Sequence, residues 1–219
     1  MNDQVKIPCM FIRGGTSRGP YFLKSDLPSD INKRDKILLA AMGSPYLRQI
    51  DGLGGAEPVK SKVAIIDKSS EEGIDIDYYF AQLKIDKPIV DTKPSCGNIL
   101  VVVGPYAIEK GLVEAKNGET SIIVRDKNTG MKIEQIVQTP NKQVQYDGNF
   151  KIDGVPTPGS PIKLKFLDII GSQTNKLFPS GNKIDEIDKI KFTLIDCAVP
   201  MVIFKDTDLG LNGSESFEQ

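Results

Sequence analysis

Three short stretches of the sequence carry residue types that could do chemistry. SCGN (residues 95–98) places a cysteine before Gly-Asn, directly ahead of an apolar run. SKVAIID (61–67) places a lysine at the head of another apolar run, and RGGTSRG (13–19) supplies hydroxyl groups, backbone N–H groups and two arginines. Thiols and amines transfer protons, whereas hydroxyls, N–H groups and guanidinium groups bind anions. The three stretches together suggest proton transfer on an anionic substrate.

Cys96 stands where we expect a helix to begin. The first N–H groups of a helix lack partners within it and lie at the positive end of its dipole. A substrate carboxylate could therefore bind at the amides of Gly97 and Asn98, and the same field favours the thiolate form of Cys96. The residues leave a second interpretation open, in which Cys96 is a small buried side chain without a chemical role.

Lys62 and the RGGTSRG stretch also have two interpretations each. Loss of water around Lys62 would favour its neutral amine, which can accept a proton, but a lysine at the end of a strand is more often an exposed one. Thr16, Ser17 and the arginines either bind an anion or form a plain hairpin turn. The chain has no histidine, so a general base near neutral pH must be Lys, Asp, Glu, Cys or Tyr.

The composition narrows the class of partner. The 219 residues are 39% hydrophobic and carry a net charge of -1, without a long basic run, so neither nucleic acid nor a membrane is expected as a partner. No apolar run is long enough to span a bilayer, and we expect a cytoplasmic protein. Three cysteines without a CxxC pair predict neither a metal site nor a disulfide framework. No nucleotide-binding glycine pattern occurs, so nucleotide binding is not supported.

The elements that must position these residues can be predicted from periodicity. Residues 5–15 and 19–28 read as a β-hairpin with GGTSRG as its loop, and a surface helix is expected between residues 29 and 42. Strands are expected at KVAIID and at IDIDYYFAQLKID. A single helix from Ser95 or Cys96 to Lys110 is apolar almost all round, which predicts burial on every side and a kink at Pro105.

The second half of the chain reads as nearly all β. TSIIVRDKNTGMKIEQIVQT predicts two strands with a DKNTG turn, and further short strands are expected at QVQYDGNFKIDG, PIKLKFLDI, IKFTLIDCA and MVIFKD. Cys9 and Cys197 fall inside predicted strands, and we expect both in the core.

An ordered series of motifs resembles the PrpF-like 2-methylaconitate cis-trans isomerase family, within the diaminopimelate epimerase-like superfamily. The series is RGGTSRG, DGLGG, SKVAII, CGNILVVVGPYAIEKGLV, GSPIKLKFLD, KLFPSGN and LIDCAVPMVIF. The resemblance implies an α+β domain in which a curved, mostly antiparallel sheet wraps a central buried helix. Because family members are longer, residues 1–190 are expected to form the N-terminal domain. Residues 191–219 would then be strands and a linker towards a second, similar domain that this chain lacks.

The resemblance also implies a function. It predicts a cofactor-independent isomerase of unsaturated di- or tricarboxylates, in which Lys62 takes an allylic proton and Cys96 is a second acid or base. Gly97 and Asn98 would hold one carboxylate. The remaining predicted substrate contacts are Thr16, Ser17, Arg18 and Ser61. The expected partner is a small carboxylate, and a homodimer is compatible with the family.

Three alternatives to this function stay open. The chain could resemble the 4-oxalomesaconate tautomerases more closely in its substrate. It could be an amino-acid racemase or epimerase of the same fold, which would need a second, opposed cysteine. It could also be a carboxylate-binding protein without catalysis.

Overall fold

A computed structural model describes residues 4–167, 169–171 and 173–216 of the chain. The chain divides into two compact units, Met1–Leu167 and Asp168–Gln219, which are described separately below. Residues 190 and 191, between which the sequence predicted a domain boundary, both belong to strand β10 (Ile190–Cys197) of the second unit, and the predicted missing domain stays a prediction. None of the described helices is long and apolar enough to cross a membrane.

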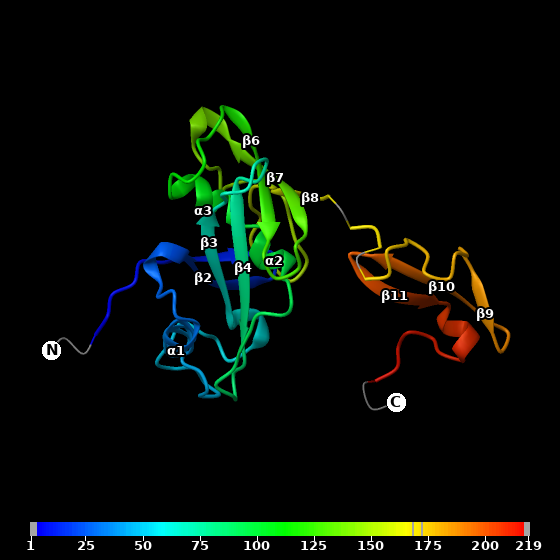
Figure 1. Cartoon of the computed structure of the whole chain (residues 1–219). Helices are drawn as coiled ribbons and strands as arrows, with labels where there is room; N and C mark the ends of the chain where they lie inside the picture. Colours follow the sequence, from blue (N-terminus) through cyan, green and yellow to red (C-terminus); the bar gives the residue numbers. More distant parts are fainter. Residues whose placement is uncertain (1–3, 168, 172, 217–219) are drawn as a thin grey trace. The chain divides into compact units, whose positions relative to one another are not determined.

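The first unit is built on an eight-stranded mixed sheet in the order β1-β2-β3-β4-β6-β7-β8, with β5 paired to β4 (Figure 1). Its strands are β1 Met10–Gly14, β2 Ser17–Leu23, β3 Lys62–Lys68, β4 Ile76–Leu83, β5 Val90–Asp91, β6 Gly118–Asp126, β7 Lys132–Thr139 and β8 Lys163–Phe166. The pairs β2–β3 and β4–β6 are parallel, and the other pairs are antiparallel. Short 3-10 turns lie at Lys24–Asp26, Pro58–Lys60 and Pro140–Lys142.

Helix α1 (Ile31–Met42) covers one face of the sheet. Asp30 caps its start, because a side-chain oxygen accepts the N–H of Lys33, and Gly43 ends it with a left-handed φ of 75°. Its buried residues Leu38 and Met42 belong to a cluster with apolar side chains of β2, β3 and β4. The predicted surface helix is therefore confirmed, and its apolar stripe closes the outer layer of the domain.

Two short helices, and not one long helix, pack on the other face. Helix α2 spans Gly97–Leu100 and α3 spans Val103–Glu109, so the predicted single helix with a kink at Pro105 was wrong. Pro105 is the third residue of α3, where a backbone N–H would have no partner inside the helix, so proline costs little there. The interruption falls before it, at residues 101–102.

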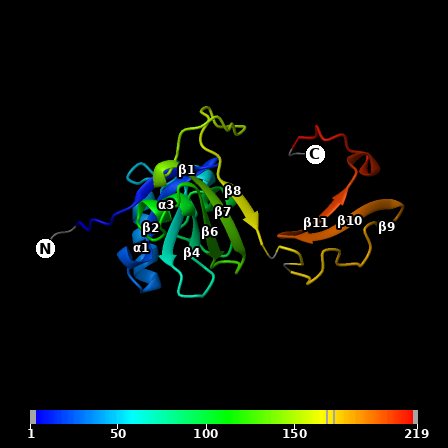
Figure 2. The same ribbon diagram turned by 90° about the horizontal axis from the view of Figure 1, so that it is seen from above.

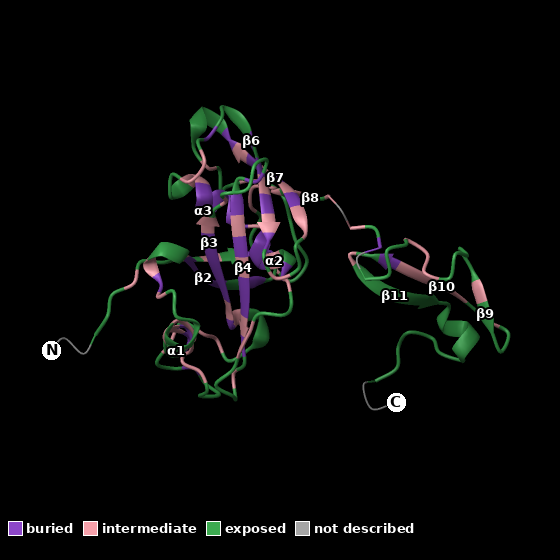
Figure 3. Ribbon diagram, in the orientation of Figure 1, coloured by how far each residue is buried: buried purple, intermediate pink, exposed green. Residues whose placement is uncertain are grey.

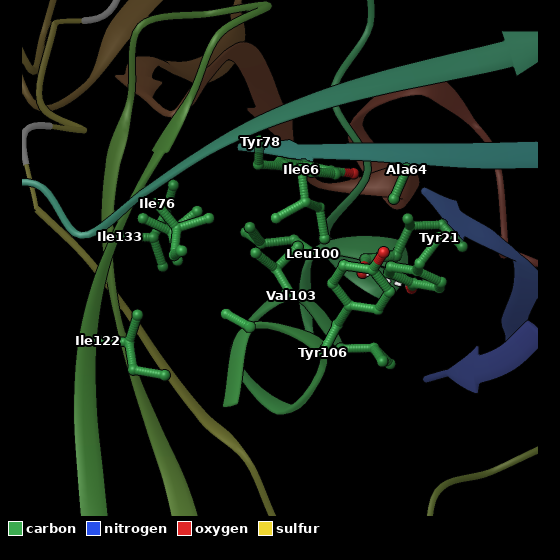
Figure 4. Packing of buried hydrophobic residues seen from close by; sticks show 14 of the residues in the cluster. Tyr21, Ala64, Ile66, Ile76, Tyr78, Leu100, Val103, Tyr106, Ile122 and Ile133 are labelled. Atoms are coloured by element: carbon green, nitrogen blue, oxygen red, sulfur yellow. Dashed lines mark hydrogen bonds between the residues drawn. The ribbon is translucent and has the colours of Figure 1, made fainter. Parts of the chain in front are cut away.

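The main core lies between these helices and the curved sheet. Figure 4 shows Leu100, Val103 and Tyr106 of the helical segment facing side chains from β2, β3, β4, β6 and β7. Seen from above, the strands curl around α3 (Figure 2). The predicted burial of the helical segment and the α+β architecture, a curved sheet around enclosed helices, are confirmed.

One predicted strand, the start of another and the burial of both predicted core cysteines were wrong. β1 begins only at Met10, after Pro8, which has no N–H to give to a ladder, so Cys9 precedes the strand and is exposed. Cys197 is the last residue of β10 and is also exposed. QVQYDGNFKIDG forms no strand. Only an isolated bridge joins Phe150 to Gly159, because this segment is rich in glycine and proline.

The second unit contains a three-stranded antiparallel sheet in the order β11-β10-β9. Its strands are β9 Asp185–Ile187, β10 Ile190–Cys197 and β11 Val199–Phe204, followed by a 3-10 turn at Asp206–Leu209. Every residue of β11 is exposed, and Figure 3 shows most of this unit in the colour of exposed residues. Gly171 and Asp196 are buried, and the carboxylate of Asp196 accepts the backbone N–H groups of Gln173 and Thr174.

Candidate active site

The hairpin of β1 and β2 places the hydroxyl groups of the site. The predicted six-residue loop is in fact the two residues Gly15 and Thr16, since Gly14 pairs with Ser17. Gly15 has a φ of +51°, which glycine adopts without strain. Ser17 is therefore a strand residue, only 2% exposed, and its rigid backbone fixes its hydroxyl.

Lys62 is the first residue of β3, next to β2. A Cβ added at Gly19 of β2 would lie 1.9 Å from the carbonyl oxygen of Lys62, so this close approach requires glycine. The Nζ atom of Lys62 lies 3.2 Å from Ser17 Oγ and 3.1 Å from Cys96 Sγ. It also lies 5.9 Å from the centre of the Phe80 ring. The amine is thus enclosed between a hydroxyl, a thiol and an aromatic ring.

Cys96 immediately precedes α2 in an extended conformation and is 8% exposed. Two buried tyrosines tie this turn to the sheet. The hydroxyl of Tyr78 donates to the carbonyl of Cys96 at 3.4 Å, and that of Tyr21 donates to the carbonyl of Ile99 at 2.7 Å. Burial raises the pKa of both tyrosines well above the usual value, so both remain neutral donors at physiological pH.

Asn98 and Gly97 complete the turn. Asn98 Nδ2 donates to Thr16 Oγ1 at 3.0 Å and to Ser17 Oγ at 3.4 Å, which joins the helix to the hairpin. A Cβ added to Gly97 would meet nothing within 4 Å, so this glycine faces open space. Because α2 has only 4 residues, its dipole is much smaller than that of the predicted long helix. Any anion binding here depends on the N–H groups themselves.

A cationic pocket adjoins these residues. Its volume is about 220 Å³, and it is lined by Arg13, Thr16, Ser17, Arg18, Lys60, Gly154, Val155 and Pro156. Lys60 is paired with Glu57 at 3.0 Å, whereas no salt bridge to Arg13 or Arg18 occurs within the described part of the chain. The guanidinium of Arg18 lies 5.5 Å from the centre of the Phe11 ring. The pocket therefore presents positive charge beside the Ser17 hydroxyl.

Ser61 precedes Lys62, but its hydroxyl bonds to a residue outside the predicted site. It is fully buried, and its hydroxyl donates to Gln49 Oε1 at 2.7 Å. The same Gln49 oxygen accepts the N–H of Ala56, and its Nε2 donates to Ser44. The Ser61 side chain thus anchors the glycine-rich loop, and its predicted contact with substrate stays a prediction.

The sequence indicated Arg13 only as one of the two arginines of RGGTSRG and did not indicate Lys60 or Gln49. Lys60 of the cationic pocket could have been found, because it lies next to the SKVAIID stretch. Gln49 precedes the DGLGG stretch and carries no recognisable signal of its own. No cluster of three or more side chains of the metal-binding types His, Cys, Asp and Glu occurs among the residues that the structure describes.

An amine beside a thiol, with hydroxyl and amide donors around them, is an arrangement with the chemical groups that proton transfer on an anionic compound requires. A family model described as PrpF protein matches residues 4–219. The chain belongs to the PrpF family.

Named relatives agree with this assignment. The chain is 50% identical over 208 residues to the (4E)-oxalomesaconate Delta-isomerase of Novosphingobium sp. (strain KA1), covering 95% of this chain and 58% of that protein. It is 37% identical over 230 residues to the 2-methyl-aconitate isomerase of Cupriavidus necator, covering 97% and 58%. The crystal structure of methylitaconate-delta-isomerase has a TM-score of 0.91 at 39% identity, covering 98% of this chain and 57% of that one. The chain thus spans less than two thirds of these relatives.

Proposed function

We propose that this chain contributes the proton-transfer half of an isomerase that acts on small unsaturated carboxylates without a cofactor. The observation that carries the proposal is the contact of 3.1 Å between Lys62 Nζ and Cys96 Sγ. Two groups that can each give and take a proton stand side by side there, within reach of the Ser17 hydroxyl. The named relatives are isomerases, which supports the same class of reaction.

The proposed reaction moves one proton. The neutral amine of Lys62 takes a proton from the carbon next to the double bond, and the electron pair left behind spreads into a carboxylate as a dienolate. If the proton returns to the far end of the dienolate, the double bond has shifted. If rotation comes first and the proton returns to its original carbon, the product is the other geometric isomer. Donors from Gly97, Asn98 and Thr16 would stabilise the negative charge as it develops.

Cys96 is the second acid or base in this scheme. It would deliver a proton when the carbon to be reprotonated lies away from Lys62, and the amine beside it would restore that proton afterwards. Its position at the end of the Lys62 side chain supports this role.

The cationic pocket favours substrates with three carboxylates over those with two. One carboxylate would bind at the Gly97–Asn98 turn and one beside Thr16 and Ser17, which leaves Arg13 and Arg18 for a third. Oxalomesaconate and 2-methylaconitate are tricarboxylates of this kind. Between them, the relative with 50% identity favours oxalomesaconate over the 2-methylaconitate that the sequence motifs suggested, with 37%.

Deuterium uptake tests the reaction. The full-length protein is incubated in deuterated water with oxalomesaconate or 2-methylaconitate, and NMR follows deuterium exchange at the allylic carbon. We expect turnover with deuterium in the product, and Lys62→Met should lower the rate roughly 10²- to 10⁴-fold. Lys68→Met, an exposed lysine at the other end of the same strand, is the matched control and should not change it. Ligand binding without exchange in the unaltered protein would show a carboxylate-binding protein and overturn the proposal.

The substrate class has its own test at Arg18. We expect Arg18→Gln to weaken binding of a tricarboxylate such as trans-aconitate about tenfold, because a charged hydrogen bond contributes about 1.5–3 kcal/mol. Binding of a dicarboxylate should change less than threefold. Calorimetry with both ligands gives the ratio, and Arg48→Gln, an exposed arginine outside the pocket, is the control. An equal loss for both ligands would contradict a third carboxylate position.

A further inference from the structure

The break between α2 and α3 exposes backbone groups that a continuous helix would pair. The carbonyls at the end of α2 and the N–H groups at the start of α3 have no partners inside their own helices. Leu100 and Gly104 are both buried, so water does not reach these groups. An unpaired buried group costs about 1–3 kcal/mol, and the break needs partners from elsewhere in the fold.

A single side chain from the sheet supplies both partners. Gln135 of β7 donates its Nε2 to the carbonyl of Leu100 at 2.7 Å, and its Oε1 accepts the N–H of Gly104 at 2.7 Å. Gln135 is fully buried, and Gly104 is packed against it, since an added Cβ would lie 2.7 Å from Oε1. The Gln135 amide therefore fills the break and forms one short hydrogen bond to each side of it; we call this pair of bonds the Gln135 bracket.

This bracket sits a few residues from the reacting groups. Leu100 closes the first turn of α2, because its N–H bonds to the carbonyl of Cys96 at 2.9 Å. Fixing the carbonyl of Leu100 therefore fixes the far end of the same turn that carries Cys96. The tyrosine hydroxyls of β2 and β4 hold this turn from the other side, at Cys96 and Ile99.

We propose that Gln135 is the positioning residue of the site, which holds the Cys96–Asn98 turn against Lys62 by bridging the break between the helices. Gln135 touches neither Lys62 nor Cys96 and acts through the backbone. A buried amide at this point is costly unless both its ends are bonded, and both are. The consequence for catalysis rests on the proposed function, but the placement of the thiol does not.

Reactivity of the Cys96 thiol measures that placement without any turnover. Cys9 and Cys197 are exposed and are replaced by serine, so iodoacetamide reports on Cys96 alone. The alkylation rate is measured at a pH about one unit above the usual thiol pKa of roughly 8.5, so that it reports mainly the accessibility of the thiol. We expect Gln135→Met, which keeps the shape but has no hydrogen bond to give, to raise the rate at least fivefold. The Gly104 amide should also lose protection from hydrogen exchange.

The matched control is Thr139→Val on the same strand. Thr139 faces the interior like Gln135, and its hydroxyl is bonded to Thr120 and to the carbonyl of Lys116, far from α2 in sequence. It should lower stability with the Cys96 rate unchanged. Repeating the measurement at low urea concentrations separates local release of the turn from global unfolding. The alkylation rate is insensitive to denaturant if the turn is released locally, and it rises with denaturant if the whole protein must unfold. If Gln135→Met does not fold, Gln135→Glu keeps the shape and the acceptor, loses the donor when ionised, and should raise the rate in the same direction.

Two outcomes overturn the proposal. One is an unchanged alkylation rate of Cys96 in Gln135→Met while the Gly104 amide loses protection from hydrogen exchange. The Gln135 bracket would then stabilise the break between the helices without positioning Cys96. The other is an equal rise in the rate for Thr139→Val, since the effect would then be general loss of stability. In the protein with all residues its gene encodes, Gln135→Met should lower kcat about tenfold and change KM less than threefold. Absence of all turnover in the unaltered protein would count against the proposed function and would leave the thiol measurement to decide on Gln135.

Discussion

At the scale of single residues, small side chains set the geometry of the site. Gly19 allows β2 to approach Lys62, and Gly15 turns the chain so that Ser17 faces the amine. The polar side chains then fall within hydrogen-bonding distance without strain. The sequence motifs predicted Lys62, Cys96, Ser17, Thr16 and Asn98, and the structure brings these residues together. Their roles in catalysis stay predictions until the exchange experiments are done.

Gly97 is a residue whose role can be separated from folding. Since a Cβ there meets nothing within 4 Å and its φ is not positive, Gly97→Ala should leave the free energy of unfolding unchanged or raise it by up to about 1 kcal/mol. If substrate lies against this turn, the methyl group should weaken carboxylate binding at least tenfold. Urea unfolding and ligand titration of the same variant give both values. Unchanged affinity would show that the ligand does not approach Gly97.

At the scale of elements, the fold depends on how helix ends are satisfied. α1 follows local rules, with an aspartate at its start and a glycine at its end, and the sequence predicted its limits well. The segment after Cys96 does not follow local rules. Its apolar run predicts one helix, but the bracket from β7 stabilises a break that neighbouring residues do not encode. The sequence therefore predicted that this segment is helical, but it did not predict that the segment forms two helices.

The cap of α1 gives a prediction at this scale. Asp30→Ala should lower the free energy of unfolding by about 1 kcal/mol, because the N–H of Lys33 loses its acceptor. Asp30→Asn keeps an oxygen in the same place and should stay within a few tenths of a kcal/mol. Urea unfolding of the three proteins measures the difference. Equal stability of the alanine variant would mean that packing of Leu38 and Met42 alone holds the helix end.

At the scale of the whole domain, the curl of the sheet assembles the site. Lys62 lies 45 positions from Ser17 and 34 from Cys96 in the sequence, and each comes from a different element. The sheet encloses α2 and α3 with three buried tyrosines among the core residues, Tyr21, Tyr78 and Tyr106. Their burial raises the pKa of all three phenols.

These tyrosines predict alkaline unfolding. A phenol whose pKa is raised in the folded state stabilises fully below its unfolded pKa of about 10, and this contribution falls as the pH rises further, by up to about 1.4 kcal/mol per pH unit for each group. We expect urea unfolding to become easier above about pH 10, and the tyrosinate absorbance of these three of the six tyrosines to appear only together with unfolding. Tyr106→Phe should make the fall of the unfolding free energy with pH less steep. It should not lower that free energy at pH 7, because no hydrogen-bond partner of the buried Tyr106 hydroxyl occurs among the described residues.

Tyr21→Phe provides the contrast, since its hydroxyl bonds to Ile99. Tyr21→Phe should also make the fall of the unfolding free energy with pH less steep, but it should lower that free energy at pH 7 by about 1 kcal/mol. If the tyrosinate absorbance of all the tyrosines appeared before unfolding in either variant or in the unaltered chain, burial would not be controlling these groups.

The sequence by itself determined the class of fold, the α1 helix, most strands of the first unit and most residues of the candidate site. These depend on periodicity, capping and short motifs, which are local properties of the chain. Only the tertiary structure decided that Ser61 bonds to Gln49, that the central helix is broken at residues 101–102, and that Cys9 and Cys197 are exposed. Each of these depends on a partner distant in sequence or on the limits of a strand ladder. Such contacts are fixed only when the sheet has closed around its helices.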